Sequence, residues 1–209
     1  MDTSYQEDFF KACERGNLEK VKFLVAKKEI NINLKDKYGL APLIYASRGG
    51  HNDVVNFLIE SDDIDIEVKD KYGKTCLSHI SSYDYPETVK FLLKKGANVE
   101  TKCNNGWTPL FHSCHGRSFD IVKLLVEEGG ANIEAKDNDG QTALFLAAIA
   151  NSLDIIKFLV SQAGANTEVK NNNGYKFTEY VANSSREEEI IKFVKDFQKR
   201  KEMVKPCRK

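Results

Sequence analysis

Residues 103–136 read CNNGWTPLFHSCHGRSFDIVKLLVEEGGANIEAK, and parts of this pattern recur along most of the chain. Its opening turn motif has an Asp or Asn, or here Cys103, three residues before a glycine. These glycines lie at 39, 73, 106, 140 and 174, which are 34, 33, 34 and 34 residues apart. Self-similarity at a fixed period of this length is typical of stacked repeats, in which each unit contacts only its neighbours. The spacing therefore predicts one elongated stack of helix-turn-helix units.

Each part of the repeat has a local physical reason. Asp or Asn at the first turn position accepts hydrogen bonds from backbone two residues on, and glycine adopts the left-handed conformation that other residues avoid. Thr108-Pro109 is typical of a helix start, with Thr as N-cap and Pro at the first helical position. Ala41 replaces this Thr in one unit, which predicts a capping loss of roughly 1 kcal/mol. Residues 54–59 (VVNFLI) form a broad apolar stripe that a neighbouring element must cover.

The order of these motifs, with T-P-L-x-x-A, V-V-x-x-L-L and G-A-N-x-E phrases, resembles the ankyrin repeat over roughly residues 4–197. The resemblance implies an all-α ankyrin-repeat solenoid with projecting β-turns. We expect a single domain over residues 1–203, followed by a basic tail at 204–209. Its units are an N-terminal cap at about 4–35, internal repeats at 36–69, 70–102, 103–136 and 137–170, and a C-terminal cap at 171–203.

The unit at 70–102 departs most from the family pattern. Cys76 replaces the family's proline, and residues 83–86 (YDYP) stand where Gly-His is expected. We therefore expect this unit to be the weakest internal one, with its second helix restarting at Pro86.

Composition excludes several classes of protein. The 31 basic and 31 acidic residues balance, so no net field attracts nucleic acid, and nucleic acid is not expected as a partner. The longest apolar run, residues 143–150, is too short to cross a bilayer, and residues 1–8 do not resemble a secretory signal. Five cysteines without a C-x-x-C pair indicate a reducing compartment. We expect a cytoplasmic protein without a membrane segment, although the basic residues near the C-terminus leave a nuclear location open.

Few residues suggest chemistry, and the chain contains none of the common hydrolase, phosphate-loop or dinucleotide motifs. We therefore expect no enzyme activity and no cofactor.

His112, Cys114 and His115, with His79 one repeat earlier, could bind zinc on adjacent helices. However, Cys114 shares its repeat position with Cys13, Ser47 and Ala148, which favours a small side chain in helix packing. Cys103, which replaces the turn Asp, is expected to be exposed and the most reactive thiol.

The ankyrin resemblance also implies where a partner would bind. In such solenoids, the projecting turns and the first helices form one long concave face used for recognition. The positions that map to this face are Tyr38, Leu40, Arg48, Tyr72, Lys74, Tyr83, Asn105, Trp107, His115, Asp139, Gln141, Ile149 and Tyr175. Tyr, Trp and Arg are favoured in interface hot spots, which makes Tyr38, Tyr72 and Trp107 the candidate centre. The alternative is that these rings lie on the turn backbone and stiffen it.

The sequence thus predicts a non-catalytic protein-protein interaction module or adaptor, monomeric in isolation, that binds another protein or a peptide on its concave face. Two alternatives stay open: a structural spacer or self-associating scaffold, and the regulatory repeat region of a larger enzyme assembly. Fold alone does not choose among them.

Overall fold

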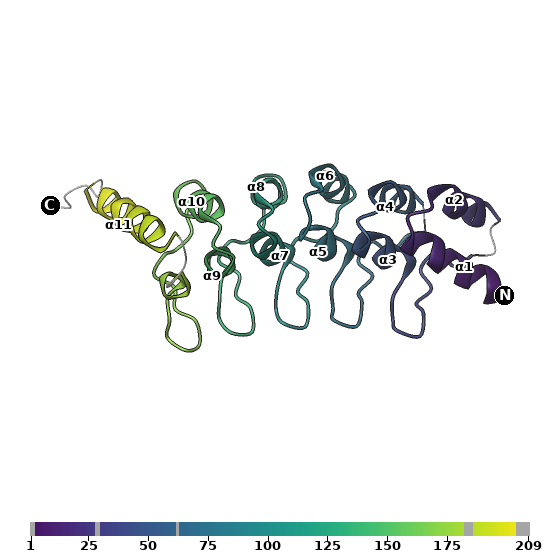
Figure 1. Ribbon diagram of the computed structural model, residues 1–209, viewed down its shortest axis with the longest axis horizontal. Helices are drawn as coiled ribbons and strands as arrows, with labels where there is room; N and C mark the ends of the chain where they lie inside the picture. The colour runs from purple at the N-terminus through teal and green to yellow at the C-terminus, as the bar shows by residue number, and fades with distance from the viewer. Residues whose placement is uncertain (1–2, 28–29, 62, 182–185, 204–209) are drawn as a thin grey trace.

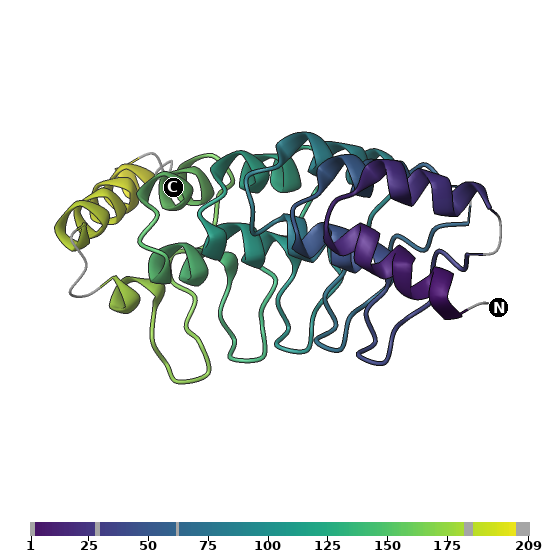
Figure 2. The same ribbon diagram turned by 45° about the vertical axis from the view of Figure 1, so that its right-hand side comes forward.

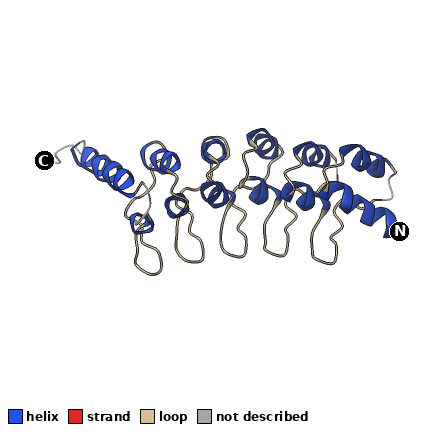
Figure 3. Cartoon of the chain, viewed as in Figure 1, coloured by secondary structure: helices blue, strands red, loops and turns tan. Residues whose placement is uncertain are grey.

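The computed structural model describes residues 3–27, 30–61, 63–181 and 186–203, and these form helices and turns without a strand (Figure 3). The all-α repeat stack predicted from the sequence is confirmed. The elements are α1 (Thr3–Glu14), α2 (Leu18–Ala26), α3 (Pro42–Arg48), α4 (Asn52–Ile59), α5 (Cys76–Ile80), α6 (Pro86–Lys94), α7 (Pro109–Gly116), α8 (Phe119–Glu127), α9 (Ala143–Ile149), α10 (Leu153–Ser161), the 3-10 helix η1 (Phe177–Tyr180) and α11 (Glu187–Met203).

The helices form two layers (Figure 1). The first helices of successive units, α1, α3, α5, α7 and α9, lie side by side in one layer, and the second helices, α2, α4, α6, α8 and α10, lie in the other. The turn motifs project from the first-helix side as a row of narrow loops (Figure 2). The stack is therefore elongated, with the described ends of the chain at opposite ends of it.

The core runs along the whole stack between the two layers. Each second helix buries one stripe, as α4 does with Val54, Val55, Leu58 and Ile59. The first helices are covered more completely, and residues 143–148 of α9 are all buried because α7, α10 and η1 surround them. The predicted position for a small side chain is confirmed, since its members are all buried: Cys13, Ser47, Ser81, Cys114 and Ala148.

Each turn motif forms a projecting loop that we call a finger: finger 1 (residues 36–40), finger 2 (70–74), finger 3 (103–107), finger 4 (137–141) and finger 5 (171–175). In finger 2, Asp70 Oδ1 accepts the N–H groups of Tyr72 at 2.8 Å and Lys74 at 2.9 Å. Gly73 has a φ of 75°, in the left-handed region. Asp36, Asp137 and Asn171 accept the equivalent bonds in fingers 1, 4 and 5, so the predicted turn chemistry is confirmed there.

Finger 3 differs because Cys103 carries no oxygen. Its backbone N–H still donates to Trp107 O at 3.0 Å, which keeps the finger closed. Within the described residues, however, the N–H groups of Asn105 and Trp107 have no side-chain acceptor in place of the missing carboxylate. Cys103 is buried, so the expectation that it is exposed was wrong.

Asparagine side chains join most fingers at their tips, in a row that we call the asparagine ladder. The Nδ2 atoms of Asn104, Asn138 and Asn172 donate to the backbone oxygens of Lys71, Asn104 and Asn138 at 3.0, 2.8 and 3.0 Å. Finger 2 has Lys71 at the same position and makes no such bond to finger 1 in the described residues. Fingers 2–5 are therefore tied together at their tips, and finger 1 stands apart.

A second row of bonds joins successive units through the loops that follow the second helices. Glutamate carboxylates there accept a backbone N–H from the following unit, at 2.7–2.8 Å: Glu67 from Asn98, Glu100 from Asn132, and Glu134 from Asn166. Each such bond satisfies a loop donor that helix and strand ladders leave unpaired.

The unit at 70–102 has the shortest α-helix among the described residues, α5, and its second helix begins at Pro86 as predicted. Thr75 caps α5 by accepting the Ser78 N–H at 3.3 Å. Thr108 makes no side-chain cap bond, so the capping loss predicted for Ala41 relative to Thr108 has no structural basis. The expected basic tail at 204–209 lies outside the described residues.

Candidate functional site

The predicted site residues occupy equivalent places on successive units. Positions three and five of the fingers recur from unit to unit, and in fingers 1, 2, 4 and 5 an Asx side chain accepts the backbone N–H groups of both. The ends of the first helices and the turns after them form a third row. We call these three rows the finger face: Tyr38, Tyr72, Asn105 and Asp139 in the first, Leu40, Lys74, Trp107, Gln141 and Tyr175 in the second, and Arg48, Tyr83, His115 and Ile149 in the third.

Most of these side chains reach the surface. Tyr38 is 56% and Tyr72 55% exposed, and Tyr83, Ile149 and Tyr175 are also exposed. The polar residues of the set that are exposed are Arg48, Asn105, His115 and Asp139, whereas Lys74, Trp107 and Gln141 are half-buried.

Leu40 is a correction to the predicted set. It is only 7% exposed and belongs to the hydrophobic core, although position five of the other fingers is half-buried or, at Tyr175, exposed. Its backbone N–H and C=O both pair with Asp36, which closes finger 1. Leu40 therefore stabilises the finger and offers no surface to a partner.

Trp107 connects two units as well as facing solvent. Its Nε1–H donates to Asp137 Oδ2 in finger 4 at 3.1 Å. Its ring lies against His112 and His115, with centroids 5.3 and 5.4 Å apart. Trp107 thus has a structural role beside any binding role, close to the alternative in which the ring stiffens the turns.

Tyr38 and Tyr72 are held less firmly. Lys37 Nζ lies 5.0 Å from the centre of the Tyr38 ring, and Lys71 Nζ lies 5.0 Å from that of Tyr72. Exposed cation–π contacts of this kind contribute only about 0.5–1 kcal/mol. More than half of each ring stays open to solvent, so these two rings are available for a partner.

The second oxygen of the turn carboxylate reaches a residue nine positions on. Tyr45 donates its hydroxyl to Asp36 Oδ2 at 2.7 Å, and His79 Nε2 lies 3.0 Å from Asp70 Oδ2. Burial, assisted by the bond to Asp36, raises the pKa of Tyr45 to about 12. Burial also lowers the pKa of His79, and the Asp70 carboxylate only partly opposes this. At the bases of fingers 1 and 2, a neutral donor therefore pairs with the turn carboxylate.

Comparison with protein families agrees with this geometry. A family model described as ankyrin repeats (3 copies) matches residues 9–103 and, in a second match, residues 79–171. The chain belongs to the ankyrin repeat family. Ankyrin repeats are generally protein-interaction modules and are typically non-catalytic. None of the described helices has the length and apolar composition that crossing a membrane requires.

One ankyrin unit lacks the carboxylate that its neighbours have. The residue nine positions after Cys103 is His112, which is 3% exposed and whose Nε2 has no hydrogen-bond partner. Burial, followed by the charge of Lys74, lowers the pKa of His112 to about 3. His112 is therefore a neutral imidazole at pH 7. The sequence carried a signal for this arrangement, because Asp70 and His79 have the same nine-residue spacing.

The histidines and cysteines weighed as zinc ligands do not converge. Among the described residues of this ankyrin array, no group of three or more His, Cys, Asp or Glu side chains is placed to hold a metal ion. Cys114 is fully buried, and burial raises the pKa of its thiol. Burial likewise raises the pKa of the Cys13 thiol to about 12. Both thiols are small core residues that carry no nucleophilic thiolate at neutral pH.

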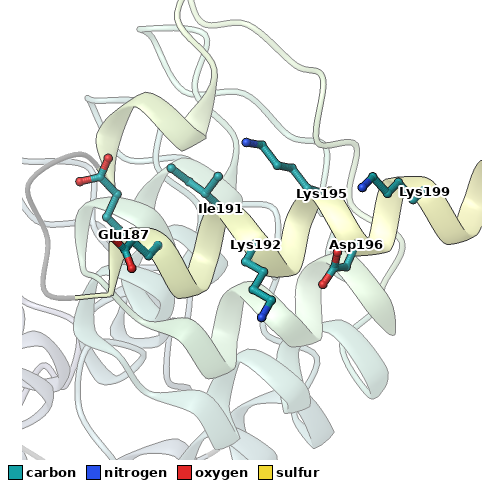
Figure 4. Close-up of a pocket in the computed structure, with 7 residues that line it drawn as sticks. Glu187, Ile191, Lys192, Lys195, Asp196 and Lys199 are labelled. Atoms are coloured by element: carbon teal, nitrogen blue, oxygen red, sulfur yellow. The ribbon is translucent and has the colours of Figure 1, made fainter.

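The surface of the ankyrin stack has several shallow hollows, and two of them bear on the question of a ligand site. One of about 470 Å³ lies between residues 82–84 and 116–120 and includes Tyr83 of the finger face. The other, of about 420 Å³, follows one side of α11 (Figure 4). Its lining comes from that helix alone and is mostly charged: Glu187, Glu188, Ile191, Lys192, Lys195, Asp196 and Lys199. Ligand pockets are usually concave and mostly apolar, so the α11 hollow does not resemble one.

Proposed function

We propose that this ankyrin repeat protein acts as a non-catalytic interaction module or adaptor that binds another protein or a peptide on its finger face. The distribution of exposed apolar side chains carries the proposal. Between residues 36 and 176, the large hydrophobic side chains that the structure describes as exposed are Tyr38, Tyr72, Tyr83, Ile149 and Tyr175. All of them lie on fingers or at the ends of first helices, and none lies on α4, α6, α8 or α10.

This asymmetry favours binding because folding does not require it. The second helices α4, α6, α8 and α10 keep their large apolar side chains buried or half-buried, whereas α2, which lies before residue 36, exposes Phe23 at 58%. Exposed tyrosines gathered on one side of a folded protein are typical of interaction sites, where Tyr is enriched among hot spots. The Asx bonds and the asparagine ladder also hold most of this face in place before any partner arrives, which lowers the ordering cost of binding.

The test is affinity capture from an extract of cells that express the protein, with a Tyr38→Ala, Tyr72→Ala, Tyr175→Ala variant beside the wild type. Trp107 is left intact because its loss would unpair Asp137. The matched control is Phe23→Ala on α2. Phe23 is 58% exposed and has Lys27 Nζ 4.8 Å from its ring centre, an environment like that of Tyr38 but away from the fingers.

We expect a protein that the wild type and Phe23→Ala retain and the triple variant loses. Titration of that protein should show losses of about 1 kcal/mol or more per hot-spot tyrosine. Circular dichroism and melting curves must first show that the variants fold. Equal capture by the folded triple variant would contradict this placement of the site.

A further inference from the structure

The first two fingers carry cations without a carboxylate partner. In the part of the chain that the structure describes, four cationic side chains of fingers 1 and 2 and of the end of α3 form no ion pair: Lys37, Arg48, Lys71 and Lys74. Elsewhere such pairs do form, as between Lys90 Nζ and Glu87 Oε1 at 3.0 Å. Within the described residues, none of these four charges is therefore neutralised by an ion pair.

These cations lie close together across successive units. The pKa of His79 is lowered first by burial and then by the charges of Lys74 and Arg48, which places both cations near one imidazole. Lys74 acts in the same way on His112 in the next unit. Tyr83 Oη lies 3.4 Å from Arg48 O, which brings the turn after α5 to the same place. Lys74 and Arg48 therefore both lie near His79, and Lys37 and Lys71 occupy the second position of fingers 1 and 2.

The nearby carboxylates do not neutralise this patch at the surface. The side chain of Asp70 is 1% exposed, and its oxygens accept the N–H groups of Tyr72 and Lys74 and pair with His79. Asp36 is engaged by the equivalent groups of finger 1. Both carboxylates are engaged in the finger bases, whereas Lys37, Arg48 and Lys71 are exposed and Lys74 is half-buried.

The positive charge is confined to the N-terminal part of the finger face, although the whole chain has no net charge. The equivalent positions in the later units are neutral apart from one histidine. Asn104, Asn138 and Asn172 take the place of Lys37 and Lys71, and Trp107, Gln141 and Tyr175 take the place of Lys74. Ser82, His115 and Ile149 take the place of Arg48. Asp139, on finger 4, is acidic. The first two fingers therefore differ from the later ones in the charge at these positions.

The asparagine ladder joins finger 2 to finger 3 but, in the described residues, does not join finger 1 to finger 2. A Cβ placed on Gly73 would meet Asn104 of the next finger, whereas one placed on Gly39 would meet nothing within 4 Å. Lys71, which takes the place of the ladder asparagine, turns to its own neighbour Tyr72 instead. There is therefore more room beside the tip of finger 1 than beside the tips of the next three fingers, although Lys35 Nζ donates to Lys69 O at 3.1 Å just before fingers 1 and 2.

We propose that fingers 1 and 2, together with the end of α3, bind an extended segment of a partner protein that is rich in Asp and Glu. Its carboxylates pair with Lys37, Arg48, Lys71 and Lys74, and its apolar side chains lie against Tyr38 and Tyr72. This rests on the proposed function and names the chemistry of the partner. Charge complementarity of this kind raises the association rate and rejects neutral and basic segments.

The experiment selects short random peptides displayed on phage against the full-length protein. The expected result is enrichment of peptides with an excess of Asp and Glu over the unselected library. An enriched peptide is then synthesised with a fluorescein label, and its affinity is measured by fluorescence anisotropy. Affinity should fall as salt rises from low to physiological concentration.

The variant that tests the patch uses residues found at equivalent places in the chain: Lys37→Asn as at Asn138, Arg48→Ser as at Ser82, and Lys74→Gln as at Gln141. We expect binding of the acidic peptide to weaken by about tenfold, since exposed ion pairs contribute modestly but add up. The control removes the same charge from exposed lysines elsewhere, with Lys94→Gln, Lys192→Gln and Lys199→Gln, and should leave the affinity within about twofold.

Three outcomes would overturn the proposal. Enriched peptides that are neutral or basic but need Tyr38 and Tyr72 would refute the acidic partner and leave the proposed function standing. A labelled single-stranded oligonucleotide that binds as tightly as the acidic peptide would reduce the patch to a general polyanion surface. Failure to enrich peptides, or binding that ignores both the charge and the tyrosine variants, would refute the inference and the proposed function together.

Discussion

Replacing Cys103 with Asp gives finger 3 the carboxylate that fingers 1, 2 and 4 already have. In finger 2 the equivalent Asp70 accepts two backbone N–H groups at 2.8 and 2.9 Å, and its other oxygen lies 3.0 Å from His79 Nε2. By the same geometry, an Asp at 103 should accept the N–H groups of Asn105 and Trp107. Its second oxygen should reach the unpaired Nε2 of His112.

The expected gain follows from these three bonds. Each contributes a net of about 0.5–1.5 kcal/mol, and part of the sum is lost to the cost of burying a carboxylate. We expect the free energy of unfolding at pH 7 to rise by about 1–2 kcal/mol, which corresponds to about 2–8 °C in Tm for a chain of this size. Cys103→Asn should recover the two turn bonds, as Asn171 makes them at 3.1 and 3.0 Å in finger 5, and its Nδ2 should donate to His112 Nε2 as Asn171 Nδ2 donates to Tyr180 Oη at 2.7 Å, but without the charge of a carboxylate.

The assay is urea unfolding followed by the fluorescence of Trp107, the single tryptophan of the chain, whose ring touches His112. Cys103→Asp is measured alone and in a His112→Leu background, since Leu146 is the natural residue at this position one unit later. The double-mutant cycle should give a coupling of about 1 kcal/mol. A gain from Cys103→Asp that is the same in both backgrounds would refute the carboxylate–imidazole bond. A loss of stability would refute the whole reasoning about finger 3.

Three further predictions concern stability. The pKa of His112 is about 3 in the folded protein and 6.5 in the free side chain, so the unfolded chain takes up a proton first as pH falls. The free energy of unfolding should therefore fall by about 2 kcal/mol between pH 7.5 and 5. The His112→Leu variant should not show this fall. Asn138→Ala should cost about 1 kcal/mol and speed hydrogen exchange in finger 4, whereas Lys71→Asn should add the missing ladder bond and stabilise by a similar amount. Gly174→Ala should cost about 1 kcal/mol in thermal melts from its φ of 82°, and Gly140→Ala should cost more, since its new Cβ also collides with the ladder side chain of the next finger.

The period, the turns and the two-helix unit could be read from the sequence because each depends on local chemistry. An Asx residue, a glycine and an apolar stripe act within a few residues of each other, so their spacing carries the information. The restart of α6 at Pro86 is of the same kind, since proline favours the first helical position.

Side-chain direction within the finger face was harder to predict. Leu40 and Lys74 share a repeat position, yet Leu40 turns into the core and Lys74 remains half-exposed, because burial at that position depends on the side chain itself. The bond from Trp107 to Asp137 links residues 30 positions apart, and the repeat period brings their fingers together without fixing where the indole points. Cys103 was misjudged for the converse reason: its position resembles an exposed turn, but the turn side chain lies in the finger base.

In the asparagine ladder and in the row of glutamate bonds, the donor lies in the later unit and the acceptor in the earlier one, at a similar offset each time. A tandem copy of residues 137–170 would therefore bring with it the asparagine that bonds the finger before it, the carbonyl that receives the next asparagine, and the loop carboxylate for the unit that follows. In-frame duplication of such a segment in the gene could lengthen the array without any new complementarity having to evolve at either junction. A copy of residues 36–69 would not share this property, because its finger has no asparagine to offer, so the array can grow more easily near its C-terminal half than at its beginning.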